Sequence, residues 1–367
     1  MNKHETLQLG QNVLVLQGGG ALGAYQAGVY QALHESGIEP DWVIGTSIGA
    51  INASLIAGNE PAHRLERLRE FWSRVEYNLT ANAVAALPGG GPIARLMTMT
   101  NGLSDFFVPN PAALLGSAWP IGAESAAFYS TTPLRRTLTE LVDFDRINRR
   151  ETRISVGAAC VCTSEMRYFD SRDIEFRIEH VLASGAMPPA FPAVRIDDQL
   201  YWDGGILSNT PMETIFDDKP RRSALVFSVH LWNQEGQEPR SIGEVLNRQL
   251  DVQFASRTRS HVERQQQIHR LRHIIAELAG RLPEAERRAD DVREMASYGC
   301  TTRMHVVALV APVLPGEDYA KDIDFSESGI RARWDAGYTH TLGAIEASPW
   351  TAPMDPLDGI ALHWIMP

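Results

Sequence analysis

The sequence predicts an α/β fold in which two parallel strands carry the chemistry at their carboxyl ends. The first observation is a continuous apolar run at residues 13–16, which is typical of a parallel strand buried on both faces. A glycine-rich loop at residues 18–23 follows, and then a helix at residues 24–36 that stops at Gly37. The second observation is another short apolar strand, at residues 42–44, which runs directly into a Gly-x-Ser-x-Gly sequence.

The Gly-x-Ser-x-Gly sequence, residues 45–49, has the pattern of a nucleophile elbow. A serine on a sharp strand-to-helix turn has a strained backbone and an exposed hydroxyl, so we predict that Ser47 is a nucleophile. Gly45 and Gly49 are needed because a Cβ at either position would collide with the crossing backbone. The helix expected at residues 50–57 would point its N-terminus at the serine, where unpaired N–H groups and partial positive charge suit a developing oxyanion.

Two interpretations compete for the glycine loop that precedes the elbow. Gly18, Gly20 and Gly23 match the dinucleotide-binding fingerprint, with a strand before them and a helix after them. That fingerprint requires an acidic residue at the end of the second strand, where this chain has the Ser47 turn. The alternative is an oxyanion hole, because neighbouring parallel strands bring the loop and the elbow to the same edge of the sheet. We favour this second interpretation, with the N–H groups of Gly18, Gly19 and Gly20 as donors.

A serine nucleophile needs a base, and the best candidate is Asp203. It ends a short aromatic strand and is followed by Gly204 and Gly205, which hold it on a tight turn. A plain Asp-Gly hairpin turn is the alternative, but a helix rather than a return strand is expected soon afterwards. Of the eleven histidines none is a clear partner, and His230 ends an apolar strand, where a lone histidine is more often structural. Because a free aspartate is a weak base for an alcohol, we expect burial beside Trp202 to raise the pKa of Asp203.

Together these motifs resemble the patatin-like phospholipase family of lipid acyl hydrolases. The resemblance lies in the glycine loop, the elbow and the Asp-Gly-Gly turn, and residues 183–192 are similar to the segment that precedes the family's aspartate. It implies a three-layer α/β/α fold, a Ser47–Asp203 dyad, an oxyanion hole in the glycine loop, and no metal or cofactor. Many members carry Arg or Lys inside the glycine loop, whereas this chain has Ala21 and Leu22.

The function that this resemblance implies is hydrolysis of fatty acyl esters of lipids, with phospholipids or lysophospholipids as substrates. Two alternatives stay open. A thioesterase or neutral-lipid esterase on the same fold would use the same chemistry at Ser47. A non-catalytic nucleotide-binding or scaffold protein would carry a vestigial elbow.

Composition indicates which kinds of partner the protein is expected to bind and in which cellular compartment it is expected to occur. The 34 basic and 45 acidic residues give a net charge of −11, so nucleic acid is not an expected partner. Three cysteines form no regular framework, which predicts reduced thiols, and Cys160 and Cys162 have no evident partners for a metal. Residues 1–6 lack the apolar core of a signal peptide, and no stretch reaches the roughly 18 apolar residues of a membrane span. We therefore expect a cytoplasmic protein that is able to visit a lipid surface.

The resemblance covers residues 10–235 and implies that they form the catalytic domain. The composition then changes, which predicts a helical extension with a last strand at 236–347 and an irregular tail at 348–367 with four prolines. A basic amphipathic stretch at 257–288 in the extension predicts contact with anionic lipid or with a second subunit, or else a solvated helix that covers the sheet. Residues 81–122 mix apolar residues with Pro and Gly. This predicts either a lid or the wall of an acyl pocket, or else a loop-rich cap that packs on the core.

Overall fold

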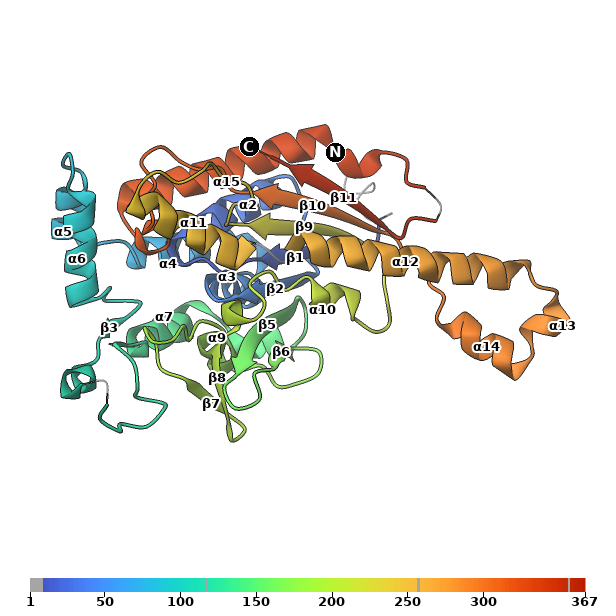
Figure 1. Ribbon diagram of the computed structural model, residues 1–367, viewed down its shortest axis with the longest axis horizontal. Coiled ribbons are helices and arrows are strands. Elements are labelled where there is room, and N and C mark those ends of the chain that lie inside the picture. Colours follow the sequence, from blue (N-terminus) through green and yellow to red (C-terminus); the bar gives the residue numbers. More distant parts are fainter. Residues whose placement is uncertain (1–8, 117, 256–257, 356, 367) are drawn as a thin grey trace.

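The computed structural model describes residues 9–116, 118–255, 258–355 and 357–366. Residues 1–6, on which the expectation about a signal peptide rests, lie outside this part. Figure 1 shows a central sheet with helices around it and helical projections at opposite ends of the molecule. Among the described helices, none is both long enough and apolar enough to cross a membrane.

Within the described residues the sheet has nine strands, in the order β11-β10-β9-β1-β2-β5-β8-β7, with β6 paired to β5. Neighbours from β11 to β5 run parallel, whereas β6 and β8 run antiparallel to β5 and β7 runs antiparallel to β8. The predicted mainly parallel sheet is therefore confirmed. The bounds are β1 Gln11–Leu16, β2 Trp42–Thr46, β5 Arg153–Cys160, β6 Met166–Asp170, β7 Val194–Ile196, β8 Gln199–Asp203, β9 Ala224–His230, β10 Met304–Val310 and β11 Ile360–Ile365.

Helices connect most of these strands, and a small antiparallel pair, β3 (Val108–Pro109) and β4 (Tyr129–Ser130), lies outside the sheet. The α-helices are α2 Ala24–Glu35, α3 Ile48–Ala57, α4 Pro61–Arg74, α5 Leu79–Ala85, α6 Gly91–Asn101, α7 Thr132–Leu141, α8 Phe144–Asn148, α9 Ile178–Ser184, α10 Glu213–Phe216, α11 Ile242–Ala255, α12 Thr258–Arg281, α13 Glu284–Arg287, α14 Asp290–Ser297 and α15 Glu327–Ala347. The short 3-10 helices are η1 Gly20–Gly23, η2 Pro111–Leu115, η3 Gly204–Ile206, η4 Lys321–Ile323 and η5 Pro349–Thr351.

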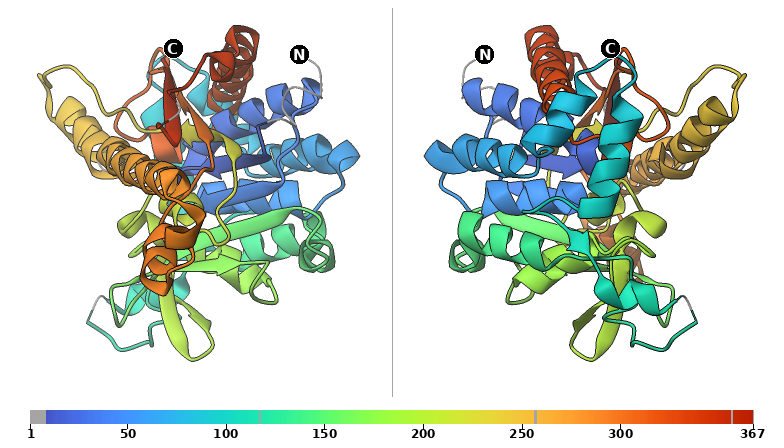
Figure 2. Two further views of the ribbon diagram at one scale, coloured as in Figure 1. Left: turned by 90° about the vertical axis from the view of Figure 1, so that its right-hand side faces the viewer. Right: turned by 90° about the vertical axis from the view of Figure 1, so that its left-hand side faces the viewer.

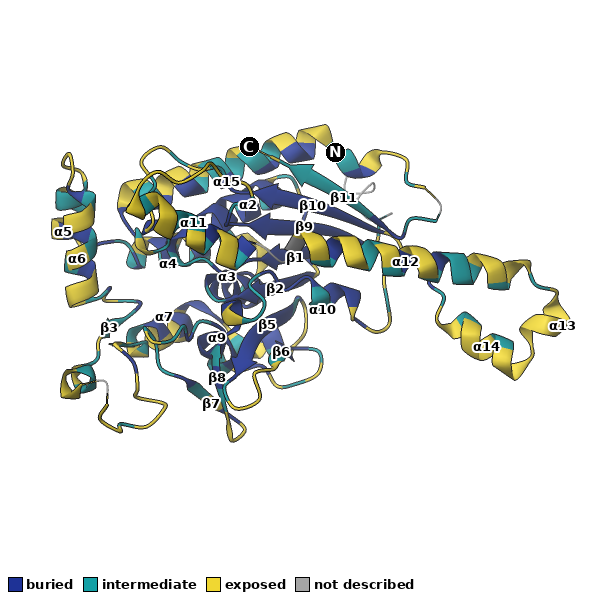
Figure 3. Ribbon diagram, in the orientation of Figure 1, coloured by how far each residue is buried: buried dark blue, intermediate teal, exposed yellow. Residues whose placement is uncertain are grey.

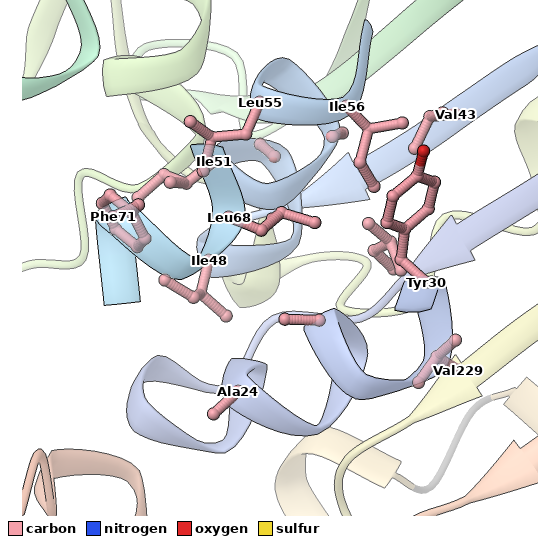
Figure 4. Close-up of a cluster of buried hydrophobic side chains, with 14 of the residues drawn as sticks. Ala24, Tyr30, Val43, Ile48, Ile51, Leu55, Ile56, Leu68, Phe71 and Val229 are labelled. Atoms are coloured by element: carbon pink, nitrogen blue, oxygen red, sulfur yellow. The ribbon is translucent and has the colours of Figure 1, made fainter. Parts of the chain in front are cut away.

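Alternate residues of the central strands face opposite helical layers. Leu14 and Val43 belong to a buried cluster with α2, α3 and α4, whereas Val13 and Ile44 pack with α10 and α12. Because successive side chains of a strand point to opposite faces, strands covered on both sides read as continuous apolar runs, as the first two strands do. Figure 2 shows the helical layers on either side of the sheet, and Figure 4 shows side chains of α2, α3 and α4 meeting in the first cluster. The predicted three-layer α/β/α arrangement is confirmed.

Burial is concentrated in these layers and falls off in the projections (Figure 3). Val262 and His269 of α12 are buried, while no described residue of α13 or α14 is. The first half of the predicted basic stretch therefore covers the sheet. Contact of its outer half with lipid or with a second subunit stays a prediction.

The expectation of an irregular tail at residues 348–367 is wrong, because β11 lies there and extends the sheet. It pairs in parallel with β10, from Met304 opposite Ile360 to Leu309 opposite Ile365. The prolines that suggested irregular structure lie outside residues 360–365, and this run is short and only partly buried at the edge of the sheet. A short edge strand of this kind gives a weak sequence signal.

The C-terminal helix α15 packs along α2 through two glycines. A Cβ on Gly28 of α2 would lie 2.0 Å from the carbonyl oxygen of Trp334, and a Cβ on Gly337 of α15 would lie 2.1 Å from that of Tyr25. The two backbones therefore approach more closely than any side chain would permit. The division at residue 235 stays a prediction, but β10, β11 and α15 are built directly onto the sheet and helices of the first part.

This contact generates a stability prediction with a control on the same helix. Gly337→Ala should lower the free energy of unfolding by at least about 2 kcal/mol, because the new methyl group meets the backbone of α2. Gly343 of α15 is exposed with open space at its Cβ, so Gly343→Ala should be neutral or stabilising by up to about 1 kcal/mol. Chemical denaturation of both variants measures the difference, and equal stabilities would contradict the close contact.

Candidate active site

Ser47 lies on the sharp turn between β2 and α3 with φ 56° and ψ −124°, a conformation that residues other than glycine rarely adopt. A Cβ on Gly45 would lie 2.3 Å from the carbonyl oxygen of Gly49, and a Cβ on Gly49 would lie 2.2 Å from that of Leu16. The expected collision with the crossing backbone therefore exists at both glycines. Ser47 is also the N-cap residue of α3, so the elbow and the helix N-terminus coincide as expected.

Ser184, the last residue of α9, holds the elbow from the other side. Its hydroxyl accepts a hydrogen bond from the N–H of Ser47 (3.0 Å) and donates one to the carbonyl oxygen of Gly157 in β5 (2.7 Å). The side chain is fully buried. The resemblance of residues 183–192 to a family segment does not indicate this bridge, because the sequence around Ser184 carries no local signal for it.

Strand register explains why Asp203 lies beside Ser47. On β5, Gly157 pairs with Thr46 at the end of β2, and the next residue, Ala158, pairs with Asp203 at the end of β8. β6 pairs with the same part of β5 along its other edge. β2 and β8 therefore meet end to end along one edge of β5, and the two turns that follow them are neighbours.

The Asp203 carboxylate is completely buried and only partly hydrogen-bonded. Its Oδ1 accepts from the N–H of Gly205 (2.7 Å), and its own N–H donates to the carbonyl oxygen of Ala186 (3.0 Å). Oδ2 has no hydrogen-bond partner among the described residues. Burial raises the pKa of Asp203 from 3.8 to about 7, while the nearby Ser47 hydroxyl and the Gly205 N–H act in the opposite direction. The Ser47 hydroxyl is thus beside the carboxylate, although no hydrogen bond of regular geometry joins them.

Gly18 differs from its expected role as an oxyanion donor. Its N–H donates to the carbonyl oxygen of Asn209 (3.2 Å), so this group already has an acceptor. Its own carbonyl oxygen accepts from Asn209 Nδ2 (3.1 Å) and from Trp232 Nε1 (2.8 Å). Gly18 therefore anchors the loop instead of contributing a donor. The N–H groups of Gly19 and Gly20 have no acceptor among the described residues, and both glycines line the same cavity as Ser47.

The other motif glycines permit close packing around the two turns. Gly20 has φ +53°, and a Cβ there would lie 2.2 Å from the carbonyl oxygen of Asp322. A Cβ on Gly23 would meet the side chain of Ile48 at 2.6 Å, and one on Gly204 would lie 2.4 Å from the carbonyl oxygen of Gly157. Gly20 therefore permits close approach to η4, Gly23 permits packing against the elbow helix α3, and Gly204 permits packing against β5.

A buried cation lies next to Trp232 rather than inside the glycine loop. Lys321 Nζ is 2.8 Å from Asp251 Oδ1, both side chains are almost fully buried, and Nζ lies 5.3 Å from the centre of the Trp232 ring. This ion pair joins η4 to α11 beside the residue that holds Gly18. Nothing in the sequence around the loop, where Ala21 and Leu22 stand, indicates it.

A mostly apolar cavity of about 380 Å³ opens beside Ser47, Gly19 and Gly20. Within residues 81–122, helix α6 and the two residues Phe106 and Phe107 contribute to its wall. The wall also includes residues 185–191 and the inner half of α11. The side chains that make it apolar include Met99, Phe106, Phe107, Tyr129, Phe191 and Phe254.

His230 has a structural environment. Its Nε2 is 3.0 Å from Ser228 Oγ, its ring lies 5.5 Å from that of Trp364, and burial lowers its pKa to about 4. The imidazole is therefore neutral and bonded within its own strand. Among the described residues no group of three or more His, Cys, Asp or Glu is arranged to hold a metal ion.

Comparison with known proteins agrees with this geometry. Residues 14–216 match a family model described as patatin-like phospholipase, and residues 252–357 match a second one described as patatin phospholipase. The chain is 29% identical over 210 residues to an uncharacterized NTE family protein of Mycobacterium tuberculosis, a match that covers 56% of this chain and 28% of that protein. The chain thus spans less than a third of the length of this relative.

Two shorter matches lie in proteins with named activities. The lysophospholipase nte1 of Aspergillus terreus is 59% identical over 44 residues, which is 12% of this chain and 3% of that protein. The triacylglycerol lipase ptl3 of Schizosaccharomyces pombe is 40% identical over 65 residues, which is 18% of this chain and 14% of that protein.

The bridge made by Ser184 generates a prediction about turnover. Ser184→Ala removes the acceptor of the Ser47 N–H and the donor to Gly157, so the elbow loses its lateral support. Turnover of a short-chain ester should fall at least tenfold with KM nearly unchanged, and the free energy of unfolding should fall by about 1–3 kcal/mol. Ser54→Ala is the control, because Ser54 is equally buried and donates to the carbonyl oxygen of Ile51 (2.8 Å) away from the elbow. If both variants kept full turnover, Ser184 would have only a structural role.

Proposed function

Because the chain belongs to the patatin-like phospholipase family, we propose that it hydrolyses fatty acyl esters of lipids, with phospholipids or lysophospholipids as the substrate class. The observation that carries the proposal is the apposition of a strained, accessible serine and a buried carboxylate whose pKa is raised to about 7, at the mouth of an apolar cavity. The name of one relative, a lysophospholipase, supports the same class.

In the proposed reaction Asp203 is the general base and Ser47 the nucleophile. The ionised carboxylate accepts the proton of the Ser47 hydroxyl as its oxygen attacks the ester carbonyl carbon. The N–H groups of Gly19 and Gly20 donate to the oxygen that becomes negative in the tetrahedral intermediate. Asp203 then returns the proton to the leaving alcohol, and the same carboxylate activates a water molecule that releases the fatty acid. A carboxylate with a pKa near 7 is about as strong a base as a histidine, which is why a dyad suffices.

The acyl chain is assigned to the apolar cavity. Most of its wall consists of aromatic and aliphatic side chains, and few polar groups lie there beyond those next to Ser47. A bound hydrocarbon chain would therefore leave few polar groups of the wall without a hydrogen-bond partner. Arg95 is part of the wall but is neutralised by Asp318, 2.5 Å away. A neutral-lipid substrate would use the same residues, and the similarity to a triacylglycerol lipase favours it as the second candidate. Comparing the hydrolysis of lysophosphatidylcholine with that of a triacylglycerol distinguishes the two.

The nucleophile is tested by Ser47→Ala. Hydrolysis of both lipid and short-chain esters should fall by at least about a thousandfold, and labelling by a fluorophosphonate should disappear, because only one oxygen is removed and the fold remains. Ser54→Ala should keep both properties. Activity that survived in Ser47→Ala would exclude the serine mechanism, and a wild-type protein that is neither active nor labelled would favour a scaffold.

The base is tested by the pH dependence of the rate. Because Asp203 must be ionised to act, kcat/KM on a short-chain ester should rise about tenfold per pH unit below pH 7 and level off above it. Asp203→Asn should lower turnover by about a thousandfold or more at every pH. A wild-type profile that is flat between pH 5 and 8 would contradict the assignment.

Asp203→Asn should also change stability in a way that a merely structural residue would not. The folded pKa is raised above the unfolded value of 3.8, so Asp203 stabilises the fold below pH 4 and loses this contribution as pH rises to about 7. The asparagine variant does not ionise, so its free energy of unfolding relative to wild type should increase by roughly 4 kcal/mol between pH 4 and 8. A difference that is independent of pH would show that the carboxylate ionises with an ordinary pKa.

A further inference from the structure

The segment that we call the cap, residues 79–130, exposes an unusual amount of apolar surface. It contains α5, α6, β3, η2 and β4, and it forms one end of the molecule, which faces the viewer in the right panel of Figure 2. Nine of the 22 large apolar side chains that are exposed in the described residues lie in these 52 residues. Those with the greatest exposure are Leu79 (91%), Leu114 (90%), Leu96 (65%), Trp119 (63%) and Leu87 (62%). Monomeric proteins rarely expose apolar side chains in such density without a binding role.

The cap is also almost without charge. Its charged residues are Arg95, Asp105 and Glu124, in a chain in which 22% of all residues are charged. Each of the three has an ion-pair partner outside the cap, namely Asp318, Arg136 and Arg195. The surface therefore offers no unpaired charge that would attract a charged partner or oppose transfer into hydrocarbon.

The exposed cap is continuous with the apolar cavity. Met99 of α6 lines the cavity and is 49% exposed, and Ile323 of η4 lines it and is 37% exposed, so the cavity reaches the surface beside α6. On α6, Thr98 faces the cavity while Ile93 and Leu96 face the solvent. A ligand that covered the outer face of α6 would thus lie next to the entrance to Ser47.

We propose that the cap docks on a lipid surface of no net charge, with its exposed leucines and Trp119 inserted among the acyl chains. This rests on the proposed lipid ester hydrolysis, because the docked cavity then receives an acyl chain without its passage through water. Binding at such a surface scales with the apolar area buried, and Trp is favoured at the boundary between hydrocarbon and water. The net charge of −11 gives the whole chain no attraction to an anionic bilayer, so burial of the cap is the dominant driving force.

Flotation with phosphatidylcholine vesicles tests the docking, in a Ser47→Ala background so that the lipid is not consumed. The protein should float with the vesicles to the same extent at 0.1 M and 1 M NaCl and with or without anionic phosphatidylglycerol. In the variant Leu79→Gln/Leu96→Gln/Leu114→Gln the partition coefficient should fall at least tenfold. These side chains are exposed and do not line the cavity, so the fold and the catalytic groups are unaffected.

The matched control changes three exposed apolar residues of the opposite projection, in Leu271→Gln/Leu278→Gln/Met295→Gln. It should float like the parent protein. In an active background, only the cap variant should lose at least tenfold in hydrolysis of vesicular phospholipid, and both variants should keep full activity on a water-soluble short-chain ester. If the active protein hydrolyses no ester at all, the proposed function fails, while flotation still reports on the docking independently.

Three results would overturn the proposal. The first is flotation that the cap variant retains in full. The second is binding that requires anionic lipid and disappears at 1 M NaCl, which would assign the membrane contact to the basic helix α12. The third is a protein that does not float but dimerises in sedimentation equilibrium without lipid, with the dimer lost in the cap variant. In that case a second copy of the chain covers the cap.

Discussion

The burial of the Asp203 carboxylate is the constraint on which the candidate active site depends. A carboxyl group in this position is hard to ionise, because one oxygen has a single N–H donor and the other has no hydrogen-bond partner among the described residues. The same burial raises the pKa of Asp203 and so gives the carboxylate a basicity that a solvent-exposed aspartate lacks. Burying this carboxylate therefore lowers the free energy of unfolding, a cost that is common at functional sites with a strongly shifted pKa. Its geometry is maintained by strands β2, β5 and β8, whose register brings the serine and the carboxylate together.

The glycine loop depends on parts of the chain that lie far from it in sequence. Trp232 and Asn209 hold the Gly18 carbonyl oxygen, and the buried pair of Lys321 and Asp251 lies against Trp232. Removing either member of a buried ion pair leaves the other charge uncompensated, so this pair constrains the position of α11 and η4 strongly. The ion pair and the glycine contact between α2 and α15 show that the last third of the chain helps to support the site. The match of residues 252–357 to a patatin phospholipase model agrees with this integration.

The proposed function and the proposed docking assign two tasks to two neighbouring surfaces, the apolar cavity and the outer face of the cap. The cavity wall, with few free polar groups, suits an acyl chain. The outer face of the same cap carries leucines that no described element covers. Helix α6 contributes to both surfaces, because a helix presents different residues to its two sides. Helix α12 leads into the projection at the opposite end (Figure 1), which also contains α13 and α14 and is rich in charged residues, whereas the cap is almost without charge.

The features that can be predicted from the sequence are those that follow from local backbone sterics. The apolar strands at residues 13–16 and 42–44, the strained Ser47 and the glycines around it are all local in the chain, and each appears in the structure as expected. Tertiary structure alone decided which donors remain free in the glycine loop, since the acceptor of the Gly18 N–H is Asn209, about 190 residues away. It also decided the Ser184 bridge, the ion pair beside Trp232 and the pairing of β11. Each of these is a contact between distant segments in which neither partner has a distinctive local pattern, so only the folded chain brings them together.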